Sequence, residues 1–267
     1  MKKIRVFVAG ACGKMGQEVI HSLLKEDDLL LVGASDTRNI GMDVGFVVGE
    51  PRVGVDITGP LDHEILIASH ANVLVDFTNP QSVLKNAKAA IQAGVVPVIG
   101  TTGLDEFEID EIRALVVKKC VGAFLAPNFS IGAILMMRFT KEIAKYFPHV
   151  DIIEMHHDQK LDAPSGTALK TAEGILEVRK PMVQGHPNEY EKISGSRGAD
   201  MGGIHIHSVR LPGLIAHQEV LFGGLGQTLT IRHDVFSRET YMPGVMLAIR
   251  KASELTDLVI GLENFLE

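Results

Sequence analysis

The stretch Ile4-Arg-Val-Phe-Val-Ala-Gly-Ala-Cys-Gly-Lys-Met-Gly16 indicates the fold with which this chain begins. Residues 4–9 carry apolar side chains on both faces of a strand, and an amphipathic helical pattern follows over about residues 15–25. A glycine at every third position occupies the turn between them. A strand, a glycine-rich turn and a helix in this order are typical of the unit that binds a dinucleotide, with the pyrophosphate at the helix N-terminus. Tight packing of the strand against the helix would by itself also require such glycines.

An acidic residue supports the dinucleotide interpretation. A second apolar run, Leu29–Ser35, ends directly before Asp36, about 20 residues beyond the glycine turn, where a carboxylate can accept hydrogen bonds from the adenosine ribose. Arg38 and Lys14 could instead pair with the 2′-phosphate of NADPH, which Asp36 repels. The sequence is therefore compatible with NADH and with NADPH. Cys12 is expected to be a small residue of the loop, because nothing beside it would activate a thiolate.

Strands and helices continue to alternate through the first half of the chain. This alternation predicts the α/β class, with a doubly wound parallel sheet of Rossmann type. Asp105, followed three residues later by Glu108, is typical of a capped helix start. The strand-like runs are 73–77, 95–99 and 122–126, and the helical patterns are 81–93 and 105–119.

Two loops that follow these strands are candidates for lining a nicotinamide. Gly100-Thr-Thr-Gly103 follows the run 95–99, and Ala126-Pro-Asn-Phe129 follows the run 122–126. Ligands of open parallel sheets bind at the carboxyl ends of the strands. Ordinary turns are also rich in Gly, Thr and Asn, so neither loop decides the matter alone.

The pattern changes after about residue 128. A strand over 150–156 and a helix over 165–179 precede three strand-like runs, whose glycine-containing turns predict an antiparallel meander. We therefore expect two domains: residues 1–128 with 238–267 form the dinucleotide-binding domain, and residues 129–237 form a smaller α+β domain with an open, mainly antiparallel sheet. The three runs are 204–211, 215–222 and 227–233, and a closing helix covers about residues 238–255.

Composition and charge exclude several classes of function. The 267 residues carry a net charge of −7 and no basic block, which argues against nucleic acid or an acidic membrane as partner. No run approaches the roughly 20 apolar residues of a membrane-spanning helix. The two cysteines do not make a disulfide framework. We expect a soluble, cytoplasmic protein with no nucleic-acid or membrane partner.

A second stretch, Glu154-Met-His-His-Asp-Gln-Lys-Leu-Asp-Ala-Pro-Ser-Gly-Thr-Ala168, concentrates ionisable groups. Ser165 is a natural N-cap, so Gly166 and Thr167 would present backbone N–H groups to a carboxylate at the positive end of a helix. Lys160 adds a positive charge and a proton, and either histidine can bind a carboxylate or exchange a proton near neutral pH. A capped helix behind a solvated, charged loop is the alternative without function.

Adjacent histidines also raise the question of a metal. Glu154 and His156 share one face of the expected strand and His157 lies on the other, so the two histidines diverge unless the strand ends between them. His205 and His207 share a face as well, but neither pair has a convincing third ligand. We expect no metal, and we expect His205 and His207 to face solvent or a subunit contact.

The stretch 154–168 resembles, without gaps, the signature E-x-H-H-x-x-K-x-D-A-P-S-G-T-A of the dihydrodipicolinate reductase (4-hydroxy-tetrahydrodipicolinate reductase) family of bacterial lysine and diaminopimelate synthesis. Four other motifs are similar to the family in order and spacing, so the resemblance covers nearly the whole chain. They are the G-x-x-G-x-M-G loop, Asp-Phe-Thr at 76–78, Gly-Thr-Thr-Gly at 100–103 and Ala-Pro-Asn-Phe-Ser at 126–130.

The resemblance implies a reductase that uses NADPH or NADH to convert 4-hydroxy-tetrahydrodipicolinate, a cyclic dicarboxylate, into tetrahydrodipicolinate by hydride transfer plus protonation. It also implies a homotetramer, so that residues 129–237 would serve substrate binding and oligomerisation. Thr37 separates Asp36 from Arg38, unlike the arrangement in some members, which leaves the cofactor preference open. By the resemblance, His156 and Lys160 form the acid–base pair, and His157, Gly166 and Thr167 hold the substrate carboxylates. Beside Asp36 and Arg38, the cofactor residues would be Gly10, Ala11, Cys12, Gly13, Lys14, Met15, Gly100, Thr101, Thr102, Ala126, Pro127, Asn128 and Phe129.

Two other classes of function stay open at this point. Another two-domain NAD(P)-dependent oxidoreductase, such as an aspartate-semialdehyde or sugar dehydrogenase, would share the fold. Semialdehyde chemistry would need a thiol nucleophile in the second domain, and no cysteine follows Cys120. A non-catalytic nucleotide-sensing protein would bind the cofactor without oxidising it.

Overall fold

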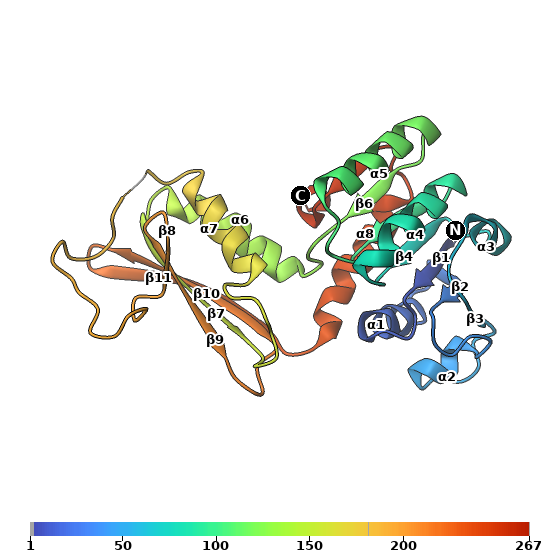
Figure 1. Cartoon of the computed structure of the whole chain (residues 1–267), viewed down its shortest axis with the longest axis horizontal. Helices are drawn as coiled ribbons and strands as arrows, with labels where there is room; N and C mark the ends of the chain where they lie inside the picture. Colours follow the sequence, from blue (N-terminus) through green and yellow to red (C-terminus); the bar gives the residue numbers. More distant parts are fainter. Residues whose placement is uncertain (1–2, 181, 267) are drawn as a thin grey trace. The chain divides into compact units, whose positions relative to one another are not determined.

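The computed structural model describes residues 3–180 and 182–266, and the chain divides into two compact units. Unit 1 comprises Met1–Ser130 and Tyr241–Glu267, and unit 2 comprises Ile131–Thr240. Each unit has its own sheet (Figure 1), and each has its own buried core. Within the described ranges, no helix is long and apolar enough to cross a membrane.

Unit 1 is built on a seven-stranded sheet in which all paired strands run parallel. Its strand order, β12-β6-β5-β4-β1-β2-β3, reverses the chain order at β1, which confirms the predicted doubly wound sheet of Rossmann type. All four residues of β4 are buried, as in a central strand with helices on both faces. The strands are β1 (Ile4–Ala9), β2 (Leu29–Ser35), β3 (Ile57–Thr58), β4 (Val73–Asp76), β5 (Val96–Ile99), β6 (Ala123–Leu125) and β12 (Leu258–Ile260).

Side-chain caps set several helix starts in unit 1. Asp105 and Glu108 form the predicted capping box, because each side chain accepts a hydrogen bond from the backbone N–H of the other residue, at 2.8 and 3.0 Å. The elements α2, α3 and β3 are too short to leave a periodic pattern, and the sequence did not predict them. The helices are α1 (Lys14–Leu23), α2 (Val44–Val48), α3 (His63–Ser69), α4 (Pro80–Gln92), α5 (Glu106–Lys119) and α8 (Met242–Ala252), with 3-10 turns at Arg238–Tyr241 and Leu262–Phe265.

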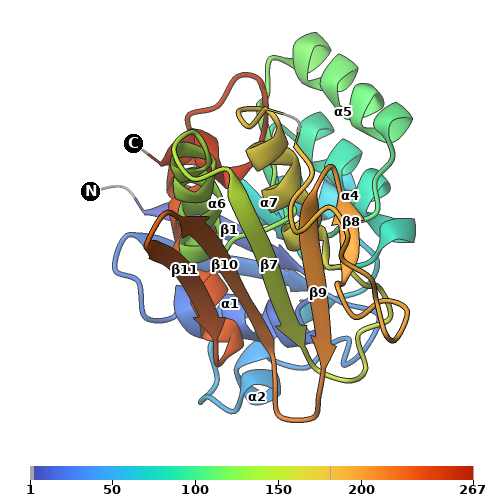
Figure 2. The same cartoon turned by 90° about the vertical axis from the view of Figure 1, so that its left-hand side faces the viewer.

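Unit 2 contains a five-stranded sheet in the order β11-β10-β7-β9-β8. Its strand pairs are antiparallel except for β7 with β9, which confirms an open, mainly antiparallel sheet. The predicted meander is wrong, because β7 lies between β9 and β10 (Figure 2). The connection between β9 and β10, residues 211–215, is long enough to cross β7, a distance of about 10 Å. The strands are β7 (His149–His156), β8 (Ala199–Met201), β9 (Ile204–Arg210), β10 (Ala216–Gly224) and β11 (Gln227–Val235).

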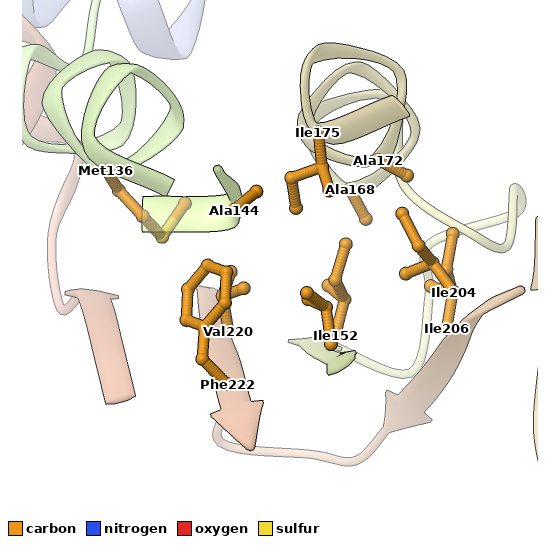
Figure 3. Close-up of a cluster of buried hydrophobic side chains, with 11 residues drawn as sticks. Met136, Ala144, Ile152, Ala168, Ala172, Ile175, Ile204, Ile206, Val220 and Phe222 are labelled. Atoms are coloured by element: carbon orange, nitrogen blue, oxygen red, sulfur yellow. The ribbon is translucent and has the colours of Figure 1, made fainter. Parts of the chain in front are cut away.

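Two helices cover one face of this sheet. They are α6 (Ile131–Ala144), which the sequence did not predict, and α7 (Gly166–Leu176), which ends earlier than expected. Small residues on α7 let it lie close to the strands, so that isoleucine and phenylalanine side chains fill the space between (Figure 3). Each such fully buried side chain contributes about 1.5–3 kcal/mol. This core comprises Met136, Ala144, Val150, Ile152, Ala168, Ala172, Ile175, Ile204, Ile206, Val220 and Phe222.

Candidate active site

The glycine turn of unit 1 leaves no room for side chains. Gly10 has a φ of +81°, and a Cβ at this residue would lie 2.4 Å from the carbonyl oxygen of Phe77. A Cβ at Gly16 would lie 2.1 Å from the carbonyl oxygen of Gly10. Gly13 lies directly before α1 and has no side chain, so no side chain caps the N–H groups at the start of α1. The turn is therefore both a tight packing device and an open helix N-terminus that can receive an anion.

Asp36 is tied to this turn. One carboxylate oxygen accepts a hydrogen bond from the Cys12 N–H at 2.9 Å, and the other accepts from the Arg38 N–H at 3.0 Å and from its Nε at 3.3 Å. The Asp36 side chain is only 8% exposed, whereas that of Arg38 is 64% exposed. Burial, together with the Asp36 carboxylate, raises the pKa of the Cys12 thiol, which keeps the thiol neutral.

Two cavities of unit 1 bring most of the predicted cofactor residues together. One has a volume of about 330 Å³ and the other about 470 Å³, and Gly13, Phe77, Thr78 and Asn79 line both. They are therefore neighbouring parts of one surface at the carboxyl ends of the strands. The first is also lined by Gly10, Asp36, Thr37, Arg38 and Lys85, and the second by Lys14, Met15, Gly100, Thr101 and Thr102.

Six of the predicted cofactor residues line neither cavity. Ala11, Cys12, Ala126 and Phe129 are buried. The ring of Phe129 lies 5.7 Å from that of Phe77, so it supports the cavity wall from behind. The other two are Pro127 and Asn128.

Asp76, to which the sequence assigned no role, joins the loops around these cavities. Its carboxylate is 1% exposed, and one oxygen accepts hydrogen bonds from the Thr78 N–H, the Thr78 hydroxyl and the Thr101 hydroxyl at 3.0, 2.7 and 2.8 Å. The other oxygen accepts from the Asn86 amide at 2.8 Å. A carboxylate that ends an otherwise apolar, buried strand is the signal that could have singled it out.

Glu154 is fully buried at the base of the candidate substrate site in unit 2. Arg210 binds both of its oxygens, at 2.9 and 2.7 Å, and Nδ1 of His156 lies 2.6 Å from Oε2. The Ser165 N–H donates to Oε1 at 3.2 Å. Burial alone would raise the pKa of Glu154, but hydrogen bonds from His156, Arg210 and Ser208 outweigh it and lower the pKa to about 2. The carboxylate is therefore ionised at every physiological pH.

The sequence did not predict Arg210, because it lies 56 residues from Glu154. The available signal was a glutamate at an inward position of a strand, since a carboxylate among apolar residues requires a cationic partner.

The predicted acid–base residues lie at the end of β7 and in the loop that follows. His156 is the last residue of β7, and His157, directly after it, is exposed. Nζ of Lys160 lies 2.7 Å from a carboxylate oxygen of Asp162. The carbonyl oxygen of Asp162 accepts a hydrogen bond from Arg210 at 2.8 Å. Arg210 therefore connects the loop that carries Lys160 to the buried carboxylate beneath it.

The start of α7 has the predicted cap. The hydroxyl of Ser165 accepts a hydrogen bond from the Ala168 N–H at 3.2 Å. Gly166 and Thr167 are the first helical residues, and their N–H groups point out of the helix end with no acceptor one turn earlier. Gly166 is exposed and Thr167 is half-buried. This helix end can therefore bind a carboxylate from solution.

Of the second histidine pair, His205 does not behave as expected, whereas the side chain of His207 is partly exposed. His205 is buried rather than facing solvent, and Nε2 of His207 lies 3.1 Å from a carboxylate oxygen of Asp151. A strand next to a long loop need not leave its polar positions exposed, which explains the error. Among the residues that the structure describes, no group of three or more His, Cys, Asp or Glu side chains could hold a metal ion.

A parallel sheet with a glycine turn behind its first strand, followed by a unit with a mixed sheet, defines a two-unit protein with a Rossmann-type NAD(P)-binding fold. Family models of the dihydrodipicolinate reductase N-terminus and C-terminus match residues 4–129 and 132–266. This chain belongs to the dihydrodipicolinate reductase family.

Individual relatives agree with this assignment over the full length. The chain is 72% identical to a 4-hydroxy-tetrahydrodipicolinate reductase of Desulfitobacterium hafniense, covering 100% of both chains. It is 52% identical to one of Moorella thermoacetica, covering 99% of this chain and 98% of the relative. The solved structure of dipicolinate-bound dihydrodipicolinate reductase from Paenisporosarcina sp. TG-14 is similar with a TM-score of 0.87 and 48% identity, covering 99% of this chain and 100% of that one.

Proposed function

We propose that this chain catalyses the NAD(P)H-dependent reduction of 4-hydroxy-tetrahydrodipicolinate to tetrahydrodipicolinate in diaminopimelate and lysine biosynthesis, in the cytoplasm. The observation that carries this proposal is the substrate segment, held by the Glu154–Arg210 ion pair, in a chain 72% identical to a reductase of that name. The dipicolinate-bound relative supports a small cyclic dicarboxylate as ligand.

The turn of unit 1 fits a dinucleotide. Gly10 and Gly16 leave space that a Cβ would fill, and the N–H groups at the start of α1 can receive the pyrophosphate. The two neighbouring cavities would take the adenosine end beside Asp36 and Arg38 and the nicotinamide end beside Gly100, Thr101 and Thr102. Ala11, Cys12, Ala126, Pro127, Asn128 and Phe129 would complete this site through backbone groups or as its supporting wall.

The reaction needs a carboxylate clamp and a proton. The substrate loses its 4-hydroxyl group as water, which leaves a conjugated C=C–C=N system with two carboxylates on the ring. Bound NADPH or NADH supplies a hydride to the carbon end of that system. Gly166 and Thr167 would donate backbone N–H groups to one carboxylate, with His157 beside them. Hydride addition leaves a negative charge shared between the ring nitrogen and the carbon next to the C=N carbon, and His156 or Lys160 would deliver the proton that ends on that carbon and leaves the C=N bond of the product.

A coupled assay tests this function. A preceding enzyme generates the unstable substrate in the cuvette, and the loss of absorbance at the nicotinamide band is followed with NADH and NADPH in separate runs. Oxidation that depends on the substrate is expected with both cofactors. Cofactor binding without oxidation would instead indicate a nucleotide-sensing protein, and activity only with a different substrate would indicate another oxidoreductase.

Arg38 is expected to determine how well NADPH is used. Replacing Arg38 with alanine removes a mostly exposed guanidinium from the adenosine cavity, so KM for NADPH should rise about 10-fold while KM for NADH changes less than about 2-fold. Arg52→Ala is the matched control, because Arg52 also pairs with an aspartate of unit 1 but lines neither cavity. Equal changes for both cofactors would contradict a contact with the 2′-phosphate.

Asp76 is expected to hold the cofactor loops in place. Asp76→Ala removes the carboxylate that accepts hydrogen bonds from Thr78, Thr101 and Asn86, so KM for the cofactor should rise about 5–20-fold and Tm should fall. Asp43→Ala is the control, because Asp43 is a buried carboxylate that accepts three backbone N–H bonds but lines neither cavity. For Asp43→Ala, Tm should fall while KM for the cofactor changes little. A rise in KM as large as that of Asp76→Ala would contradict a special role of Asp76.

We also propose a homotetramer that forms through unit 2. Its helices α6 and α7 pack on one face of the sheet, and the opposite face carries the half-buried apolar side chains of Ile153, Met155 and Val209. Light scattering on the full-length protein tests this, with a mass near four times 28.9 kDa as the expected result.

A further inference from the structure

The buried pair of Glu154 and Arg210 lies directly beneath the candidate acid–base residues. Glu154 has no exposed surface, and the Arg210 side chain is 18% exposed. Placing two charges in a protein interior is costly unless their geometry and hydrogen bonds are nearly complete. Apolar residues could have filled the same space at less cost, so this pair requires an explanation beyond the stability of unit 2.

The first part of the explanation is the protonation of the His156 ring. Nδ1 of His156 lies 2.6 Å from a carboxylate oxygen of Glu154, which is ionised and can only accept hydrogen bonds. Nδ1 must therefore carry a hydrogen. The nitrogen that remains to exchange a proton is Nε2, which has no hydrogen-bond partner among the residues that the structure describes. Glu154 thus selects one tautomer of the neutral ring and fixes the ring orientation.

The second part is the complete occupation of the Arg210 terminal nitrogens. Nη1 donates to Glu154 and to the carbonyl oxygen of Val209, both at 2.8–2.9 Å. Nη2 donates to Glu154 at 2.7 Å and to the carbonyl oxygen of Asp162 at 2.8 Å. Each nitrogen carries two hydrogens, so neither has a donor left for a substrate carboxylate, and the Nε–H, which has no hydrogen-bond partner among the described residues, is buried away from solution. Arg210 therefore affects the site by fixing the positions of Glu154 and of the loop at Asp162.

Its contacts join three pieces of the site. Through Glu154 it reaches His156 at the end of β7 and the N–H of Ser165 before α7, and through Asp162 it reaches the loop of Lys160. The strand end, the loop and the helix start follow one another in the chain, whereas Arg210 reaches them from a separate strand, β9. One buried ion pair fixes the positions of these three pieces relative to one another.

We propose, on the basis of the function proposed above, that Glu154 and Arg210 are positioning residues of the reaction: Glu154 holds His156 with Nε2 as the atom that exchanges a proton, and Arg210 holds Glu154 and the Lys160 loop. The substrate touches neither residue. Their effect is on the proton-transfer step, and cofactor binding in unit 1 does not depend on them.

Two measurements on the full-length protein test this. The first is the ¹⁵N NMR spectrum of the histidine rings in the wild-type protein, with His156 identified by its absence in His156→Gln. The neutral ring is expected to carry its hydrogen on Nδ1, and an Nε2–H tautomer would overturn the proposal. This measurement needs no activity, so it stands even if the coupled assay shows that the proposed function is wrong.

The second measurement is the kinetics of Glu154→Gln. We expect kcat to fall about 10–100-fold, KM for NADPH to stay within about 2-fold, and the pH profile of kcat to change, because a neutral amide no longer fixes the tautomer and the orientation of the His156 ring. An unchanged kcat and pH profile would overturn the proposal.

Asp151→Asn is the matched control, because it alters a carboxylate–histidine pair on the opposite face of the same strand. Its kcat and pH profile should match those of the wild-type enzyme. If Glu154→Gln does not fold, the double variant Glu154→Leu/Arg210→Met replaces the ion pair with apolar groups of similar size, a change that buried pairs tolerate. A folded double variant with wild-type kcat and pH profile would overturn the proposal, and one with lowered kcat and a displaced profile would support it.

Discussion

Replacing Lys160 with alanine is expected to lower kcat by about 10²–10⁴, the range by which a positioned proton donor accelerates a reaction. Lys160 is the one lysine on the loop between the end of β7 and the start of α7, and Asp162 holds its ammonium group at 2.7 Å. It lies in unit 2 and lines neither cavity of unit 1. The affinity for NADPH should therefore stay within about 2-fold of wild type.

Steady-state kinetics at saturating NADPH, together with a direct titration of NADPH, separate these two effects. Lys145→Ala is the matched control, because Lys145 also makes a 2.7 Å ion pair with a carboxylate of unit 2, that of Glu142. Its kcat should not change. A near-normal kcat for Lys160→Ala would remove Lys160 from the proton-donor role and leave His156 in that role.

The variant Lys160→Arg distinguishes proton donation by Lys160 from the effect of its positive charge. Arginine keeps the positive charge but does not give up a proton in proteins, because its pKa lies far above neutral pH. If Lys160 is the donor, this variant should recover the KM for the substrate but not kcat. Recovery of kcat would show that Lys160 contributes only its charge.

The sequence predicted those parts of the fold whose signals are local. The strand, glycine turn and helix of residues 4–25 needed only neighbouring residues to be recognised, and so did the capping box at Asp105. The meander failed because strand order depends on pairing between distant segments. Consecutive runs with short turns fit a meander, but β7 pairs with both β9 and β10. Periodicity within each run carries no information on that choice.

In the candidate site, too, the sequence predicted residues that are neighbours in the chain and missed partners that lie far apart in it. The motif of residues 154–168 supplied a strand end, a lysine and a capped helix, all from adjacent positions. Arg210 is 56 residues away, and Asp76 meets Thr101 and Asn86 across two other segments. Glu154 and Asp76 are both buried carboxylates at positions where an apolar residue would be expected. A buried acid in a sequence therefore predicts that a partner exists, although it does not identify that partner.

Gly16→Ala is expected to weaken cofactor binding by about 10–100-fold, equivalent to the 1–3 kcal/mol that overpacking a tight site costs. Gly16 lies in the first turn of α1, where alanine should by helix propensity alone stabilise the protein by about 1 kcal/mol. A Cβ at this residue, however, would lie 2.1 Å from the Gly10 carbonyl oxygen and 3.0 Å from the Cα of Ala11. Both atoms belong to the backbone of the turn, so the turn itself must move.

Gly174→Ala is the control for this prediction, because it makes the same substitution inside α7, where the new Cβ meets only the far end of the Lys141 side chain at 4.0 Å. Its Tm should stay the same or rise, and its cofactor affinity should not change. For Gly16→Ala, a titration of NADPH and a thermal unfolding curve are measured together, since the strain can appear in either. If the NADPH affinity and the Tm both match those of the wild-type protein, the turn accommodates the Cβ without strain. Close packing would then not be the reason for glycine at this position.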